Sequence, residues 1–144
     1  MVYADNAATT KMSRTAIDAM LPYMETHYGN PSSLYRFAQE GKTDLERARA
    51  EIAACLNARP EEIYFTSGGT EADNWALRGV AELMALKGRK GGHIITSAIE
   101  HHAVLHTAQY LEKQGYEVTY LPVDGRGLVD PAALEGAIRP DTIL

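Results

Sequence analysis

Alternating strand-like and helix-like segments follow residue 60, and this pattern constrains the fold more than any other feature of the chain. Helices that connect successive strands make those strands parallel, and parallel sheets are normally covered by helices on both faces. The sequence therefore predicts an α/β fold with a mostly parallel sheet. We expect strands at 62–67, 93–97 and 116–123, and helices at 70–88, around 104–111 with a stop at Gly115, and at 131–138.

The front of the chain has a different pattern. After an extended start, Ser13 is suited to cap a helix, and Pro22 is expected to break or restart it. Apolar residues at helical spacing over 34–56 predict one long amphipathic helix that ends before Pro60. The single cysteine, Cys55, is expected to be a buried structural thiol on that helix.

Charge and composition exclude several classes of partner. The net charge is −5 and neither sign forms a long block, so nucleic acid and an anionic membrane surface are not expected partners. The sequence has no leader pattern and no apolar stretch long enough for a membrane span. One cysteine permits no internal disulfide. We expect a cytoplasmic protein.

The segment FTSGGTEADN at 65–74 is a candidate phosphate seat. A strand-like run leads through two glycines into a helix that opens at Thr70, where unpaired N–H groups and the helix dipole favour an anion. The hydroxyls of Ser67 and Thr70 are further candidate donors. No Walker or dinucleotide glycine motif is present, and ordinary turn and capping residues explain this local pattern equally well.

A second candidate lies in SAIEHHAVLH at 97–106, where a strand passes into a helix. His101 is closest to the strand end, and strand ends line ligand crevices in open α/β sheets. His102 and His106 are four residues apart and share a helical face, but two imidazoles without a third ligand do not predict a metal site. The small-residue segments DNAATT and GNPSS favour turns.

Taken together and in this order, these segments resemble the cysteine desulfurases of the NifS/IscS type, in the class V aminotransferase group. The resemblance covers essentially the whole chain. It rests on Y-x-D-N-A-A-T-T, GNPSS, T-S-G-G-T-E-A-D-N, I-I-T-S-x-x-E-H, G-Y-E-V-T-Y-L-P-V and the closing R-P-D-T-I-L.

The resemblance implies a pyridoxal 5'-phosphate enzyme of fold type I, like aspartate aminotransferase. Residues 1–13 would lead toward the small domain, and 14–144 would form the first part of the large cofactor-binding domain. Gly69 and Thr70 would contact the cofactor phosphate. His101 would stack on the pyridine ring and take part in proton transfer. The family also implies a homodimer.

The implied reaction removes sulfur from L-cysteine, giving L-alanine and an enzyme persulfide for a sulfur acceptor or an iron-sulfur scaffold protein. It needs a Schiff-base lysine, an acid paired with the pyridinium nitrogen and a nucleophilic cysteine, which in the family follow the segment matching residue 144. Neither Cys55 nor any lysine here matches those positions, so we expect these 144 residues alone to be inactive.

One position departs from the family pattern: Tyr35 stands where a histidine is common. No role is transferred to Tyr35, and the substrate is correspondingly less constrained. Two alternative functions stay open. One is a related fold-type-I enzyme, such as a selenocysteine lyase or an aminotransferase. The other is a non-catalytic fragment that serves only for binding or dimerization.

Overall fold

The computed structural model describes residues 2–144, which form two compact units, 2–64 and 65–144. The division at residue 13 expected from the resemblance concerns the domains of a longer enzyme and stays a prediction. The first unit contains α1 (Arg14–Glu25), α2 (Arg36–Cys55) and the 3₁₀ helix η1 (Pro60–Glu62). The second contains α3 (Gly69–Leu86), β1 (His93–Ser97), α4 (His102–Lys113), β2 (Glu117–Leu121) and α5 (Pro131–Ala137).

Helix α1 begins where the sequence predicts it, because the Ser13 hydroxyl oxygen accepts a hydrogen bond from the Ala16 N–H at 3.1 Å. The expected break at Pro22 is wrong, since the helix continues to Glu25. Proline removes one N–H donor, but its own carbonyl can still accept. The N–H groups of Thr26 and His27 both donate to the Pro22 carbonyl, which closes the helix after the proline instead of at it.

Helix α2 confirms the predicted long helix, but it buries only Ala38 and Ala53. The expectation that Cys55 is buried is wrong: its side chain is exposed. Ala53, two residues earlier, is the buried position, and two residues on a helix are about 200° apart around the axis, so Cys55 lies on the opposite side. The GNPSS segment forms a turn beside α2. A Cβ on Gly29 would lie 2.9 Å from the Ala38 Cα, so only glycine allows this close approach.

The strand predicted at 62–67 is not formed. Residues 60–62 are a 3₁₀ helix, and 63–67 run on without pairing to another strand. The Ile63 carbonyl, which a sheet neighbour would have to engage, instead accepts a hydrogen bond from the Arg49 guanidinium on α2. A strand-like composition is not sufficient to form a β-strand when no neighbouring strand pairs with the segment.

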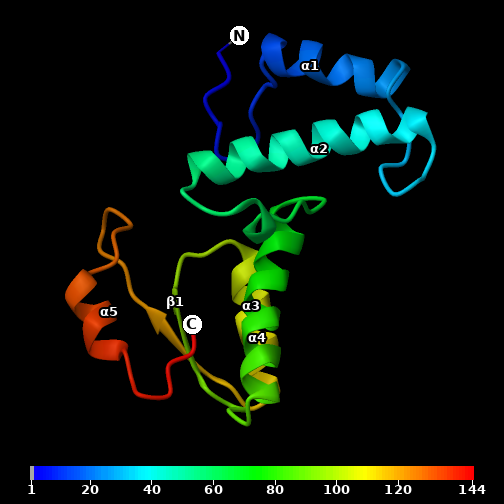
Figure 1. Cartoon of the computed structure of the whole chain (residues 1–144). Helices are drawn as coiled ribbons and strands as arrows, with labels where there is room; N and C mark the ends of the chain where they lie inside the picture. The colour runs from blue at the N-terminus through cyan, green and yellow to red at the C-terminus, as the bar shows by residue number, and fades with distance from the viewer. Residues whose placement is uncertain (1) are drawn as a thin grey trace. The chain divides into compact units, whose positions relative to one another are not determined.

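In the second unit, β1 and β2 form a parallel pair with His93 opposite Glu117 and Ser97 opposite Leu121. Figure 1 shows α3 and α4 side by side along one face of these strands and α5 on the other side of them. Ile94 packs into the main core with residues from α3, α4 and the segment before β2. The core residues are Leu77, Ala81, Ile94, Leu111 and Tyr116, with Val104, Val118 and Ile143 packed against them. The α/β class with a parallel sheet is thereby confirmed.

The last residues start a further extended segment along the free edge of β1. The His93 N–H donates to the Asp141 carbonyl at 2.9 Å, the Ile143 N–H donates to the His93 carbonyl at 2.8 Å, and the Ile95 N–H donates to the Leu144 carbonyl at 2.9 Å. Thr142 forms a parallel bridge with His93. Residues 142–144 therefore occupy the place of a third parallel strand.

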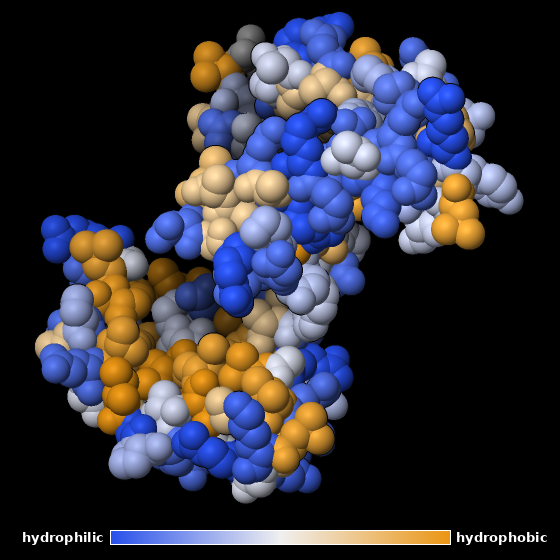
Figure 2. Space-filling model, in the orientation of Figure 1, coloured by the Kyte–Doolittle hydropathy of each residue, from blue (hydrophilic) through white to orange (hydrophobic). Residues whose placement is uncertain are grey.

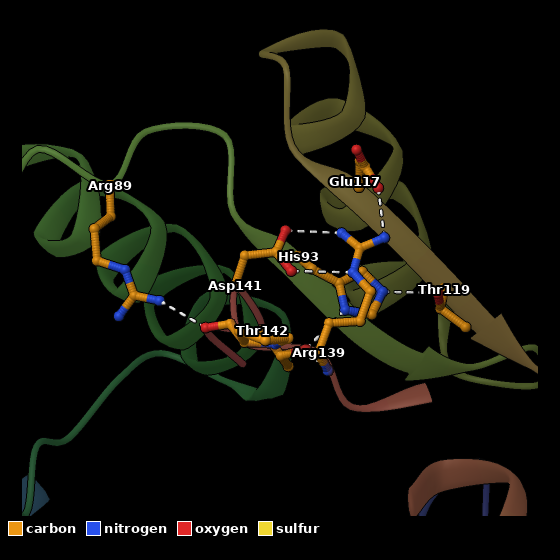
Figure 3. Close-up of polar contacts among 8 residues, drawn as sticks. Arg89, His93, Glu117, Thr119, Arg139, Asp141 and Thr142 are labelled. Atoms are coloured by element: carbon orange, nitrogen blue, oxygen red, sulfur yellow. Dashed lines mark hydrogen bonds and ion pairs between the residues drawn. The ribbon is translucent and has the colours of Figure 1, made fainter. Parts of the chain in front are cut away.

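A polar cluster holds this segment on the sheet (Figure 3). The buried His93 ring lies between two hydroxyls, with Nδ1 2.9 Å from the Thr142 Oγ1 and Nε2 2.7 Å from the Thr119 Oγ1. The Arg139 guanidinium pairs with Glu117 at 2.7 Å and with Asp141 at 2.9 Å. These groups satisfy one another, which is the pattern of a structural cluster.

Much of the apolar surface of the chain stays exposed. Figure 2 shows apolar side chains gathered on the visible face of the second unit. The exposed large apolar residues of this unit include Ile99, Leu128, Leu134 and Ile138. No helix within residues 2–144 is both long enough and apolar enough to cross a bilayer.

Candidate functional site

The start of α3 presents unpaired backbone donors. The first hydrogen bond of the helix runs from the Ala72 N–H to the carbonyl of Gly68, the N-cap, at 3.1 Å. The N–H groups of Gly69, Thr70 and Glu71 precede it and therefore have no helical acceptor. A Cβ built on Gly68 or Gly69 would meet no atom within 4 Å, so a ligand can approach this backbone closely.

One hydroxyl expected at this seat is already engaged. Glu71 Oε2 accepts hydrogen bonds from the Ser67 N–H at 2.7 Å and from the Ser67 hydroxyl at 2.8 Å. These bonds, the backbone one first, lower the pKa of the Glu71 carboxyl. Because the only hydroxyl hydrogen of Ser67 goes to Glu71, Ser67 is not a free donor for a bound anion. Thr70 is left as the hydroxyl donor.

His101 is the N-cap of α4. Its Nδ1 accepts a hydrogen bond from the Ala103 N–H at 3.1 Å. A ring nitrogen that accepts carries no hydrogen, so the neutral imidazole has its hydrogen on Nε2. The ring therefore offers a flat face and one N–H donor. Taking up a second proton at Nδ1 would break the cap.

The starts of α3 and α4 open on one pocket of about 440 Å³, a size within the range of small-molecule sites. Thr70 and His101 both line it, so the two candidate segments of the sequence meet here. His102 and His106 also line it, with ring centroids 5.2 Å apart. The sequence indicates only His101 as a site residue in this segment. The lining residues are Thr70, Asn74, Arg78, His101, His102, Ala103, His106, Thr107 and Tyr110.

The pocket lining favours an anion. It includes Arg78, whose guanidinium carbon lies 5.0 Å from the centroid of the Tyr110 ring, and three histidines, but no carboxylate. No lysine lines it either. Within residues 2–144, no three His, Cys, Asp or Glu side chains group as metal ligands.

Two further residues of this pocket are not indicated by the sequence pattern. The Thr107 hydroxyl donates to Asn74 Oδ1 at 2.8 Å, and Asn74 Nδ2 donates to the Thr70 carbonyl at 2.9 Å. The four-residue spacing from Thr70 to Asn74 places both on one face of a helix. The contact between Asn74 and Thr107 joins positions 33 residues apart, for which the sequence offers no local signal.

Residues 2–144 match the family described as aminotransferase class-V. The chain belongs to this family. Class V aminotransferases and the desulfurases among them use pyridoxal phosphate, as the sequence resemblance implied. The chain is 56% identical to the cysteine desulfurase IscS of Methanosarcina thermophila and 51% identical to that of Dictyoglomus turgidum, over 99% of its own length.

Solved structures of this family share the fold. A NifS-like protein superposes with a TM-score of 0.89 at 41% identity, covering 98% of this chain and 38% of the other. SspA in complex with cysteine superposes with a TM-score of 0.88 at 38% identity, covering 97% and 40%. The chain spans only about a third of the curated relatives, with 35% of the M. thermophila protein covered. The partial fold-type-I class is thereby confirmed.

The described residues fit one end of the family cofactor. The free N–H groups at Gly69 and Thr70, with open space above them, suit a phosphate. His101 offers a flat ring in the pocket that Thr70 lines, whereas Gly69 is not among the lining residues. The pocket lining contains neither a lysine that could anchor the cofactor nor a carboxylic acid that could pair with its ring nitrogen. The fit is therefore to the phosphate and to one ring face.

Proposed function

We propose that the protein is a pyridoxal-phosphate-dependent cysteine desulfurase and that this chain supplies its phosphate seat and its ring-stacking histidine. The observation that carries the proposal is the meeting of the α3 start and the α4 cap at one pocket. In this proposal Gly69 and Thr70 bind the phosphate and His101 stacks on the ring. All three assignments come from the family resemblance, and the geometry supports them.

Each residue has a defined task in this proposal. The Gly69 and Thr70 N–H groups and the Thr70 hydroxyl fix the phosphate by charge-assisted hydrogen bonds, which sets where the ring lies. His101 holds the ring from one side and presents its Nε2–H. The bound cofactor supplies the electron sink for carbanion chemistry at the substrate α-carbon.

The proposed substrate is L-cysteine. The relatives at about half identity are named cysteine desulfurases, and a solved neighbour at 38% identity was determined with cysteine. In the reaction the bond between the cysteine Cβ and sulfur breaks, the sulfur passes to an enzyme thiolate to give a persulfide, and the Cβ gains a proton to give L-alanine. Cys55 belongs to the first unit and does not line the pocket, so we assign it no part in sulfur transfer.

We also propose that the protein acts in the cytoplasm as a homodimer and delivers sulfur to an acceptor or an iron-sulfur scaffold protein. The names of the IscS relatives support this assignment of partner. Light scattering of the full-length protein tests the dimer, and a pull-down with a purified scaffold protein tests the partner. A monomer in light scattering would contradict the proposed dimer, and no retention of the scaffold in the pull-down would contradict the proposed partner.

The decisive experiment uses the full-length protein that carries this chain, loaded with pyridoxal phosphate. We expect sulfide under reducing conditions, together with an equal amount of alanine, from L-cysteine. Release of selenide from L-selenocysteine without turnover of L-cysteine would instead indicate a selenocysteine lyase. Pyruvate or another keto acid formed from an amino donor would indicate an aminotransferase.

Thr70 tests the phosphate seat separately from turnover. Thr70→Val removes the hydroxyl but keeps the shape of the side chain, whereas Thr70→Ser keeps the hydroxyl. We expect Thr70→Val to lose cofactor on dialysis about tenfold faster than Thr70→Ser, because one charge-assisted hydrogen bond is lost. Equal retention in the two variants would contradict the placement of the phosphate at Thr70.

A further inference from the structure

Asn74 and Thr107 both line the pocket and join the two helices that form its walls. Asn74 is half-buried on α3, and Thr107 is buried on α4 with 5% of its surface exposed. The Thr107 hydroxyl lies 2.8 Å from Asn74 Oδ1 and 2.7 Å from the Ala103 carbonyl. This is a tertiary polar contact between the two helices that carry the site.

The direction of these hydrogen bonds is fixed by chemistry. A backbone carbonyl can only accept, so the Asn74 NH₂ group must face the Thr70 carbonyl, 2.9 Å away. Its oxygen therefore faces Thr107, whose single hydroxyl hydrogen lies between two acceptors. If either side chain turned, the hydrogen bond between them would be lost and the half-buried Asn74 Oδ1 would lose its donor.

The hydrogen bonds of Asn74 and Thr107 connect the phosphate seat at one end of the site with His101 at the other. At one end Asn74 engages the carbonyl of Thr70, whose N–H and hydroxyl belong to the phosphate seat. At the other end Thr107 engages the Ala103 carbonyl, and the Ala103 N–H donates to His101 Nδ1. A continuous path thus runs from Thr70 through Asn74, Thr107 and Ala103 to His101.

We infer that Asn74 and Thr107 are positioning residues, which hold the phosphate seat of α3 and the His101 cap of α4 at one fixed separation. This inference rests on the proposed function, since it concerns the same site. A cofactor with a rigid ring and a phosphate arm needs both contacts at once. A shift of one helix along the other would lose one of them.

The test uses Thr107→Val, which keeps the shape and removes the hydroxyl, and Thr107→Ser, which keeps the hydroxyl. In the full-length protein we expect Thr107→Val to weaken pyridoxal phosphate binding about tenfold and to reduce the visible circular dichroism of the bound cofactor. Thr107→Ser should restore both. Asn74→Ala should weaken cofactor binding and reduce the dichroism as much as Thr107→Val does. The double variant should lose no more cofactor affinity than either single variant.

Tyr116→Phe is the matched control. It removes another buried hydrogen bond to α3, from the Tyr116 hydroxyl to the Ala81 carbonyl at 2.8 Å, and Tyr116 does not line the site pocket. We expect this variant to lower the thermal midpoint as Thr107→Val does while leaving the cofactor affinity and the dichroism at wild-type values. Equal effects of Tyr116→Phe and Thr107→Val on the cofactor would overturn the inference.

A readout without cofactor separates this inference from the proposed function. In the apo protein, the ¹⁵N shifts of His101 report whether Nδ1 still accepts from Ala103. We expect Thr107→Val to move these shifts and Tyr116→Phe to leave them unchanged. Failure of the wild type to bind pyridoxal phosphate would sink the proposed function alone. Unchanged His101 shifts and unchanged binding in Thr107→Val would sink the inference alone.

Discussion

At the scale of single residues, the His101 ring has two tasks that restrict one another. Nδ1 caps α4, so the neutral ring keeps its hydrogen on Nε2 and can donate but not accept there. A stacking and donating role uses the ring as it stands. Proton uptake by His101 requires that the cap be given up first.

Substitutions at His101 separate these tasks. His101→Asn keeps an N-cap acceptor, so the thermal stability should stay close to wild type. Turnover in the full-length protein should fall at least a hundredfold, and the visible spectrum of the cofactor should change, because the ring is gone. His102→Ala is the comparison: His102 also lines the pocket, but the resemblance assigns it no role, so this change should leave both turnover and spectrum nearly intact. A harmless His101→Asn with a damaging His102→Ala would reverse our assignment of the two histidines.

At the scale of elements, the start of α3 depends on the Glu71 carboxylate. Its pKa is lowered below 4.5 in the folded chain by the Ser67 donors. A carboxyl whose folded pKa is lowered stabilises the fold fully above its unfolded pKa and loses this effect as the pH falls through the folded value. The contribution of Glu71 should therefore disappear in acid.

Urea unfolding of wild type and Glu71→Gln at several pH values measures this effect. We expect the wild-type midpoint to be higher at pH 7 and the difference to shrink in acid, as the pH falls through the lowered pKa of the Glu71 carboxyl. Glu135→Gln, at an exposed position on α5, should give no difference at either pH. A difference between wild type and Glu71→Gln that persists undiminished in acid would contradict the role of the charge.

The edge segment 142–144 depends on the buried His93 ring. His93→Leu fills a similar volume but leaves the hydroxyls of Thr119 and Thr142 facing an apolar group. We expect it to lower the free energy of unfolding by about 2 kcal/mol. His93→Gln retains a donor and an acceptor and should lose less. Urea denaturation measures both, and equal stability of His93→Leu and wild type would show that these bonds contribute nothing.

At the scale of the whole molecule, the site within residues 2–144 is only one side of the proposed catalytic centre. The pocket has no lysine in its lining, and Cys55 belongs to the other unit. We expect the 144 residues alone, supplied with pyridoxal phosphate, to release no more sulfide and alanine from L-cysteine than free cofactor does. The full-length protein is the positive control, and turnover by the short chain would refute this expectation.

The sequence by itself determined what local chemistry decides. Ser13 caps its helix as predicted, and Asp130 caps the helix predicted at 131–138, because their side-chain oxygens accept from N–H groups two or three residues away. Gly115 follows α4 with a positive φ of 90°, which glycine adopts without strain. The alternating helical and strand patterns of α3, β1, α4 and β2 likewise predicted the parallel α/β class.

Only the tertiary structure decided which of these elements meet. Residues 62–67 have a strand composition, but pairing needs a neighbour, and the Ile63 carbonyl is taken by Arg49. Asn74 and Thr107 look like ordinary helix residues until α3 and α4 pack together. His102 and His106 join His101 at the pocket for the same reason. Capping acts within a few residues, whereas contacts between helices depend on how the whole chain packs.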